Sequence, residues 1–450
     1  MTTYVYFSWV FGTLILAFEC WRFARERRVD PLSFISLMFL GVFVIAPNII
    51  AVTPPSSRFY ERFLWLAALP EDWQIYVEAA FVITFGYAGI VGGYYFQFAP
   101  PSGELRPVQS PRRLMILGTV FLVIGGASFL VFAEIVVGGI AKTLTVAPIL
   151  RADPLSLGYH PLLFIKRFTV FSLPAAFFFI QSLSYARIWQ EKIIIIGLIS
   201  VSLMVSLAAL YLDGGRLNLI FYAMIFLVPF MMKNVRMAVI LIMAAILLSF
   251  FVVLFLHDFV QKLTSTDQIL EHIELPNRSP MDRIKEIFLE FSFPLSDILS
   301  ALRNVPETIP FRYFADFPLV APRFLPGGIF SQNLPPQIGD ISTDALIGAV
   351  PWGIPVDLLS MGWFSLGAPG VVILAILYGR LARVIDRALP QRICYGADMV
   401  RSCWMMMAGF VVMYGDPRWL LIEQLHWEAA LLTYLLFCTR WHPFKPSLID

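Results

Sequence analysis

A four-residue connection, Asp213-Gly214-Gly215-Arg216, places two opposite charges between two apolar segments. The two glycines permit the positive φ angles of a tight turn, so Asp213 and Arg216 are expected to lie close together. One interpretation is a turn that is closed by an ion pair. The other is an anion site, because a guanidinium binds the phosphate of a lipid through a two-pronged fork. Both interpretations remain open on the sequence alone.

A second polar group follows an apolar segment at Gly415-Asp416-Pro417-Arg418, and Glu423 and His426 come shortly after it. Glu423 and His426 are spaced i, i+3 and therefore share a helix face. If the segment is helical from its start, Arg418 falls within about two turns of both. The group is either a buried polar network that anchors the helices, or part of a site for acid–base chemistry and phosphate binding.

A long segment, 258–350, is rich in proline, aromatic residues and arginine. It contains two runs whose side chains could bind a substrate. The first is Phe311-Arg312-Tyr313-Phe314-Ala315-Asp316-Phe317, and the second is Pro322-Arg323-Phe324-Leu325-Pro326-Gly327-Gly328. Aromatic faces suit sugar rings, and Arg323 suits phosphate, although loop arginines are more often solvated surface charges. The residues that we expect to contact a glycan are Arg312, Tyr313 and Phe314.

The same segment also contains a helical pattern. Apolar residues recur at helical spacing from Met281 to Val305, with an interruption at Pro294. We expect an amphipathic helix that lies on the membrane surface.

The elements that must position these groups are membrane spans. The 450 residues are 58% hydrophobic and 14% charged, with a mean hydropathy of +0.75. Soluble chains are about 45–50% apolar and about 25% charged, so the composition excludes a soluble domain. The first apolar run, Val5 to Cys20, precedes its basic residues, which predicts a retained span and not a cleaved signal peptide.

Apolar runs long enough to cross the bilayer recur along the chain. The predicted spans are 4–21, 32–53, 74–95, 114–134, 163–183, 193–212, 217–232, 237–257, 352–378, 399–414 and 420–438. Basic residues concentrate in the odd-numbered connections and the tail, which predicts an outer N-terminus and a cytoplasmic C-terminus. Lys166 and Arg167, near the outer end of span five, run against this rule, and so does Arg216 at the start of span seven. The predicted regions are spans 1–8 in 1–257, a large outer loop in 258–350, and spans 9–11 with a cytoplasmic tail in 351–450.

The cysteines give no sign of a metal site. They lie in, or next to, the inner halves of spans one, ten and eleven, with no CxxC or Cys/His spacing, and we interpret them as packing residues. There is also no DxD at the outer surface and no histidine cluster. We therefore expect no metal and no other cofactor. The four cysteines are Cys20, Cys394, Cys403 and Cys438.

In order and spacing, the chain resembles the oligosaccharide repeat-unit polymerases of bacterial surface polysaccharides, the Wzy-type O-antigen and enterobacterial-common-antigen polymerases. The likeness covers most of the chain in topology and a small part of it in motif, with Arg418 matching an arginine expected between the last two spans. The segments that carry it are Gly214-Gly215-Arg216, the run from Phe291 to Gly328 with Ala321-Pro322-Arg323-Phe324-Leu325-Pro326, and Gly353-Ile354-Pro355-Val356-Asp357 leading to Ser365-Leu366-Gly367-Ala368-Pro369-Gly370.

The resemblance implies an all-α integral membrane protein of the GT-C type, with about 11 transmembrane helices and one large helical or irregular periplasmic loop. It implies a metal-independent glycosyltransferase in the bacterial inner membrane, with a periplasmic N-terminus and a cytoplasmic C-terminus. The enzyme would transfer the growing glycan onto an incoming lipid-linked unit and release polyprenyl pyrophosphate. The implied partners are polyprenyl-pyrophosphate-linked oligosaccharide, membrane lipid and a chain-length co-polymerase, with no nucleic acid.

The resemblance also implies roles for particular residues. Arginines would stabilise the charge that builds on the departing pyrophosphate, namely Arg216, Arg323 and Arg418. The candidates for the base that takes the proton from the acceptor hydroxyl are Asp357, Asp416 and His426. Many family members have Thr followed by Gly-Glu where this chain has Asp357 and then Ser360-Met361, so the identity of the base stays open.

Two other functions remain as alternatives. An O-antigen ligase shares the topology, the outer loop and the donor, and a catalytic histidine in the large loop would favour it. Only His272 is well placed for that role. A flippase for lipid-linked oligosaccharides would need basic residues at the centres of the spans, and the sequence lacks them.

Overall fold

A computed structural model provides the structure of the chain. The residues that it describes are 1–26, 28–54, 57, 59–60, 63–96, 103–107, 110–152, 160–213, 216–233, 282, 285, 288–324, 334–348, 353–389 and 395–443. The predicted eighth span, 237–257, and most of the predicted loop before residue 288 lie outside these residues, as does His272.

The chain forms two compact units, each assembled from stretches that are distant in sequence. The first unit comprises Met1–Ala99, Asn277–Asp386 and Met405–Ile422. The second comprises Pro100–Pro276, Arg387–Trp404 and Glu423–Asp450. Residues of the predicted loop, 288–324 and 334–348, therefore share a core with the first helices of the chain.

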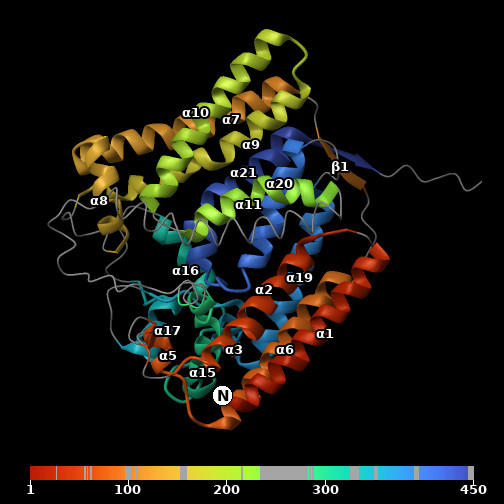
Figure 1. Ribbon diagram of the computed structural model, residues 1–450, viewed down its shortest axis with the longest axis vertical. Helices are drawn as coiled ribbons and strands as arrows, with labels where there is room; N and C mark the ends of the chain where they lie inside the picture. The colour runs from red at the N-terminus through yellow and green to blue at the C-terminus, as the bar shows by residue number, and fades with distance from the viewer. Residues whose placement is uncertain are drawn as a thin grey trace, which may run out of the picture. The chain divides into compact units, whose positions relative to one another are not determined.

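All the regular elements that the structure assigns in the first unit are helices (Figure 1). Its helices are α1 (Thr2–Glu26), α2 (Pro31–Phe39), η1 (Leu40–Ile45), α3 (Ala46–Ala51), α5 (Leu64–Ala67), α6 (Trp73–Tyr95), α15 (Phe293–Asn304), α16 (Asp316–Val320), η6 (Ala321–Phe324), α17 (Ile338–Ile347), α18 (Leu358–Leu366), α19 (Ala368–Ala388) and η8 (Trp419–Glu423). The last two run slightly past the boundary of the unit.

The second unit combines helices with one small sheet. Its helices are α7 (Pro111–Val131), η2 (Phe132–Val137), α8 (Ile140–Ala152), η3 (Leu163–Phe171), α9 (Ser172–Tyr185), α10 (Trp189–Asp213), α11 (Arg216–Lys233), α20 (Tyr395–Phe410) and α21 (Leu425–Cys438). Helix α20 begins in this unit and ends in the first. The strands β1 (Gly103–Pro107) and β2 (Thr439–Pro443) pair in antiparallel fashion, with Gly103 opposite Pro443.

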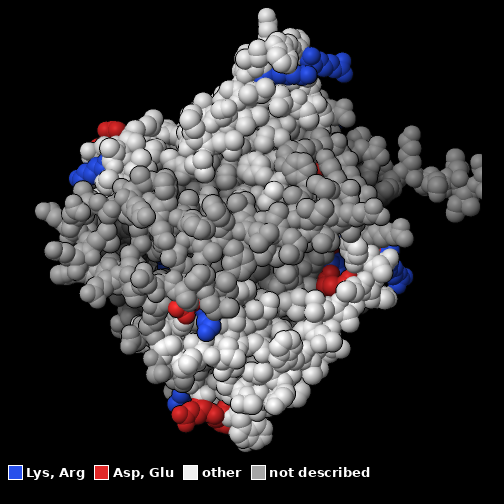
Figure 2. Space-filling model, viewed as in Figure 1, with Lys and Arg blue, Asp and Glu red and all other residues white. Residues whose placement is uncertain are grey.

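Seven of the described helical segments are long and apolar enough to cross a membrane, which confirms an all-α membrane protein. They are Thr2–Glu26, Pro31–Ala51, Trp73–Tyr95, Pro111–Val137, Leu163–Tyr185, Trp189–Leu212 and Ala368–Ala388. The first six coincide with the first six predicted spans. Large apolar side chains such as Trp9 and Leu14 on α1 are more than 60% exposed, as expected of a surface that faces lipid. On the face shown in Figure 2, the charged side chains of the described residues form a few small, separate groups.

The predicted span 352–378 is replaced by two helices. The chain turns at Gly367, whose φ of +67° is a conformation that glycine adopts without strain, so α18 ends and α19 begins there. The apolar segment long enough to span is Ala368–Ala388. The predicted spans 217–232, 399–414 and 420–438 correspond to α11, α20 and the segment that ends with α21.

Helix α15 is surrounded by protein. Pro294 lies in its first turn, where the missing N–H costs no hydrogen bond, and every residue from Phe293 to Ala301 is buried. The helix packs against α6, α17 and α18. The prediction of a membrane-surface helix is therefore wrong for Phe293–Ala301, because these residues are buried by protein on every side of the helix. The predicted interruption is present as a turn at Phe291 and Ser292, between the helical residues 288–290 and the start of α15.

An arginine network joins α1, α2, α6 and α19 in the first unit. Arg22, 2% exposed, donates from Nη1 to both carboxylate oxygens of Asp30 at 2.7 Å and from Nη2 to Glu19 Oε2 at 2.7 Å. The Tyr94 hydroxyl donates to Asp30 Oδ2 at 2.8 Å, and Arg383 Nη1 lies 3.7 Å from Asp386 Oδ2. Burial alone would raise the pKa of Asp30, but the charge and hydrogen bonds of Arg22 outweigh it and hold that pKa below its usual range.

Candidate functional site

Asp357 is fixed at the start of α18 by its own backbone hydrogen bonds. Its Oδ1 accepts from the N–H groups of Leu359, at 2.9 Å, and Ser360, at 3.1 Å, which is the usual role of an N-cap carboxylate. The side chain is fully buried. Its Oδ2 has no hydrogen-bond partner among the described residues.

Asp416 reaches the same place from the segment that follows α20. The N–H of Asp416 donates to Val356 O at 3.0 Å, and the N–H of Leu358 donates to Val412 O at 3.2 Å. This pairing needs Gly415, because a Cβ there would overlap the backbone of Leu358. Asp416 is 6% exposed, and its Oδ1 accepts from the N–H of Arg418 at 2.8 Å.

A third carboxylate, Asp297 on α15, completes the group that we call the carboxylate cluster: Asp297, Asp357 and Asp416. The Ser342 hydroxyl on α17 donates to Asp297 Oδ1 at 2.9 Å. Asp297 is fully buried, and its Oδ2 has no partner in the part of the chain that the structure describes. Sequence analysis missed this residue.

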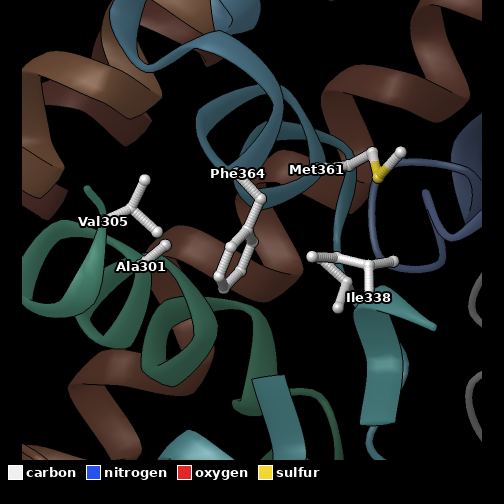
Figure 3. Packing of buried hydrophobic residues seen from close by; sticks show 6 residues of the cluster. Ala301, Val305, Ile338, Met361 and Phe364 are labelled. Atoms are coloured by element: carbon white, nitrogen blue, oxygen red, sulfur yellow. The ribbon is translucent and has the colours of Figure 1, made fainter. Parts of the chain in front are cut away.

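An apolar core holds the helices that carry the cluster. Figure 3 shows Phe364 of α18 between Ala301 and Val305, from α15 and its C-terminal end, and Ile338 of α17. These residues, with Val356 and Met361, form one buried group. Close packing of this kind fixes the helix backbones and hence the positions of the carboxylates.

The buried surroundings of the cluster raise the pKa of each of its three carboxylates. Burial raises the pKa of Asp357 to about 7, although the backbone N–H groups that it accepts from lower it. Burial raises the pKa of Asp416 to about 6, against the lowering effect of the N–H and the charge of Arg418. The pKa of Asp297 lies well above its usual range because of burial and the charges of Asp357 and Asp416.

These values give the three groups different protonation states near neutral pH. Asp357 is poised between its two forms and Asp416 is mostly ionised, while the raised pKa of Asp297 favours its neutral form. A general base works best when its pKa lies near the operating pH, and perturbed carboxylates often mark functional sites. Asp416 is the strongest candidate for a base, because it is ionised and is the only member of the cluster with any exposed surface.

The predicted glycan-contacting run lies against the C-terminal end of α18. The N–H groups of Arg312 and Tyr313 donate to Phe364 O and Ser365 O, each at 3.0 Å. Tyr313 and Phe314 have φ angles of +51° and +60°, a left-handed conformation that costs bulky residues free energy. Tyr313 is 70% exposed, so its ring is available for stacking on a ligand.

Arg312 has a positioning role in this run. Its guanidinium forms a two-pronged ion pair with Asp316, at 2.6 and 2.7 Å, and also donates to Pro336 O at 3.1 Å. Asp316 Oδ1 accepts from the N–H of Ile338, the first residue of α17, at 3.1 Å. The next residue, Gly339, lies so close to Asp416 that a Cβ would stand 2.9 Å from Asp416 Oδ2. The exposed run is thus connected to the carboxylate cluster through α17.

The remaining predicted residues are distributed over both units. Arg418 lies next to Asp416 in the first unit. His426 belongs to the second unit, where its buried ring packs 4.8 Å from the ring of Trp427 and 6.4 Å from that of Phe171. Arg216 begins α11 and Arg323 lies in η6, but their side chains lie outside what the structure describes.

One sequence signal could have identified Asp297. It stands in Leu295-Ser296-Asp297-Ile298-Leu299, an acidic residue among apolar residues at helical spacing. A carboxylate is rarely buried fully unless it has a partner or a function. Among the described residues, no three or more His, Cys, Asp or Glu side chains are arranged to hold a metal ion.

Comparison with known proteins gives no further assignment. No protein-family model, no curated protein and no solved structure matches the chain.

Proposed function

We propose that this chain is a membrane glycosyltransferase that polymerises polyprenyl-pyrophosphate-linked oligosaccharide units. The observation that carries the proposal is the buried carboxylate cluster, in which Asp416 has a pKa of about 6 and lies beside Arg418. A carboxylate of this pKa can accept a proton from a sugar hydroxyl, and an adjacent guanidinium can stabilise a departing pyrophosphate. The resemblance in sequence to repeat-unit polymerases supplies the substrate class.

The proposed reaction transfers one glycan and one proton. The hydroxyl oxygen of the incoming lipid-linked unit bonds to the anomeric carbon of the growing glycan, and its proton passes to Asp416. The bond from that carbon to the pyrophosphate breaks, and the pyrophosphate leaves with the electron pair. Arg418 stabilises this negative charge, together with Arg216 and Arg323, the other arginines predicted for this role.

Asp297 and Asp357 have supporting roles in this proposal. The raised pKa of Asp297 favours its neutral form, and a neutral Asp297 puts no second negative charge near Asp416. Asp357 holds the start of α18 and therefore the segment that pairs with Asp416. His426 packs among aromatic rings in the second unit, so we propose no proton transfer for it.

The finer predictions from sequence belong to the same proposal. These are eleven spans, a GT-C type of fold, a periplasmic N-terminus, a cytoplasmic C-terminus and a site that faces the periplasm of a bacterial inner membrane. A chain-length co-polymerase and membrane lipid are the proposed partners. Tyr313 and Phe314 would contact the glycan.

The first test is a gel of the surface polysaccharide from a strain that lacks this chain, complemented with wild type or with Asp416→Asn. Under the proposal, the deletion strain and the Asp416→Asn strain make only a single capped repeat, and wild type restores the long ladder. Long polymer that stays on its lipid carrier would indicate a ligase and would overturn the proposal.

One observation favours a second function. The pKa of Asp357 is about 7, and a buried carboxyl that exchanges protons near neutral pH is also typical of proton-coupled transport. A flippase for lipid-linked oligosaccharides is therefore the alternative. In the same strains, repeat units trapped on the cytoplasmic face would support the flippase, whereas unpolymerised units on the outer face would support the polymerase.

A further inference from the structure

A pocket in the first unit opens between α5, α15 and α17, three helices that pack against one another (Figure 1). Its volume is about 310 Å³, at the small end of the range for ligand sites. The lining residues are Ala68, Pro70, Leu299, Ser300, Arg303, Asn304, Ala345 and Leu346. Among the residues whose side chains the structure describes, none of the site residues predicted from sequence lines it.

The pocket and the carboxylate cluster lie along one seam between α15 and α17. At one end of the seam, Ser342 of α17 donates to Asp297 of α15. Ser300 and Asn304 follow Asp297 at i+3 and i+7 on the same helix face, and both line the pocket. A rise of 1.5 Å per residue puts the far end of the pocket about 10 Å along α15 from Asp297.

Arg303 provides an unpaired positive charge at this pocket. It is exposed and forms no ion pair with any residue in the described part of the chain. The guanidinium groups of Arg22 and Arg312 in the same unit are both paired with carboxylates, those of Asp30 and Asp316. The guanidinium of Arg303 is therefore available to bind a ligand. A planar oxyanion is the group that a guanidinium binds best.

The rest of the lining suits one sugar ring. Leu346 and Pro70 offer apolar surface, while Ser300 and Asn304 offer hydrogen-bonding groups. The amide of Asn304 is oriented by its donation to Ser300 O at 2.9 Å. A monosaccharide has the same mixed character, with C–H faces and hydroxyl edges.

We propose that this pocket binds a monosaccharide unit that carries an oxyanion, either a carboxylate or a phosphate, and that Arg303 forms an ion pair with the oxyanion. The inference rests on the proposed function, because it assigns the pocket to a sugar unit near the one that reacts at the carboxylate cluster. It deepens that function by naming a charged substituent as the feature that this chain selects.

The test is binding of small sugars to the purified full chain in lipid nanodiscs, measured by isothermal titration calorimetry. The probes are methyl glucuronide, glucose 1-phosphate and the neutral methyl glucoside. We expect at least one anionic sugar to bind tenfold or more tightly than the neutral one. Arg303→Ala should remove this preference and leave the affinity for methyl glucoside unchanged.

Two further variants make the result specific. Arg187→Ala removes another exposed arginine, outside the pocket, and should leave the preference intact. Ala345→Trp puts a bulky side chain into the pocket from a position with an exposed side chain and should abolish binding of all three probes. Binding of the glucuronide alone would identify a carboxylate, and binding of the sugar phosphate alone would identify a phosphate.

Equal binding of the three probes would overturn the proposal, as would an anionic preference that survives Arg303→Ala. The outcome does not depend on polymerase activity, because no bond forms in the assay. If a strain without this chain makes normal polymer, the proposed function is contradicted, even if the pocket binds anionic sugars. If polymer is lost but the chain shows no preference for anionic sugars, only the proposal for the pocket is contradicted.

Discussion

Asp30 in the arginine network differs from Asp297 and Asp357 in the carboxylate cluster by the cations that lie beside it. Asp30 is fully buried, and Arg22, Arg28 and Tyr94 all lie within reach of its oxygens. Asp297 and Asp357 are equally buried, but each leaves one oxygen without a hydrogen-bond partner among the described residues. The pKa of Asp30 is lowered, whereas the pKa values of Asp297 and Asp357 are raised.

The difference separates a structural use of charge from a chemical one. A carboxylate that is neutralised by a guanidinium stays ionised at every physiological pH and holds its helices together. A buried carboxylate without such a partner lowers the stability of the fold when it ionises, but it can gain and lose protons near neutral pH. The arginine network thus stabilises the unit, and the carboxylate cluster is available for proton transfer.

The largest expected effect is on activity at the cluster. Asp416→Asn keeps the size of the side chain and its acceptor oxygen for the N–H of Arg418, but it cannot take a proton at neutral pH. We expect polymer formation by purified protein to fall by about 10²–10⁴-fold, the usual contribution of a general base. The rate of product formation from lipid-linked substrate measures it. Wild-type activity in this variant, with normal thermal unfolding, would contradict the assignment of the base.

The second-largest expected effect is a loss of stability when Asp30 loses its counter-ion, Arg22. Arg22→Ala leaves Asp30 buried without its main cation, and we expect a loss of about 3–5 kcal/mol in stability. Thermal unfolding in detergent, followed by tryptophan fluorescence, measures the change. Arg25→Ala is the matched control, because Arg25 is exposed on the same helix and should change stability by about 0.5 kcal/mol or less.

A second variant tests the reason for that loss. Adding Asp30→Asn to Arg22→Ala removes the unpaired charge and should restore part of the stability. If the double variant is no more stable than Arg22→Ala alone, the network acts through packing and not through charge.

The pH dependence of stability should differ between the two groups. The pKa of Asp357 rises from 3.8 to about 7 on folding, so between these values the folded chain holds a proton that the unfolded chain has released. This contribution to stability is fully present below about pH 4 and is lost as the pH rises to about 7. At about 1.4 kcal/mol per pKa unit, the effect reaches about 4 kcal/mol at most.

Asp357→Asn isolates this contribution, because asparagine also caps helices and carries no charge. We expect the unfolding temperature of the variant, relative to wild type, to increase between pH 4 and pH 8. A constant difference across this range would contradict the raised pKa. The opposite signs expected for Arg22→Ala and Asp357→Asn at pH 8 provide a direct test of the comparison.

The smallest expected effect concerns the position of Asp416. Gly339→Ala brings a methyl group within 2.9 Å of Asp416 Oδ2, so the carboxylate must shift by a few tenths of an ångström. We expect activity to fall by roughly tenfold, with little change in stability, since misplacement of a catalytic group slows catalysis. Gly353→Ala is the control, because the nearest atom to its Cβ is 3.5 Å away. Equal activity in the two variants would show that this position is not critical.

The sequence predicted the membrane helices well because hydropathy and length determine them locally. The predicted spans 74–95 and 193–212 match Trp73–Tyr95 and Trp189–Leu212 closely. Hydropathy could not detect the turn at Gly367, since the flanking residues on both sides are apolar.

The candidate site was predicted in part. Asp357 and Asp416 were identified from their neighbours in sequence, and the structure brings them together through the pairing of Val356 with Asp416. Asp297 was missed because its importance comes from tertiary packing that buries all sides of α15, and a helical stripe in the sequence suggests one buried side only. The acidic residue among apolar ones was the only local sign of this contact.

The small sheet of the second unit can form only after almost the whole chain has been synthesised. Strand β1 ends at Pro107, and its partner β2 begins at Thr439, close to the end of the sequence. At about 5–20 residues per second, the ribosome takes roughly 20 to 70 s to deliver β2 after β1 has been made. Throughout that interval the edge of β1 is open to pairing with another chain. Chain termination before residue 439 would leave this edge unprotected for the lifetime of the protein.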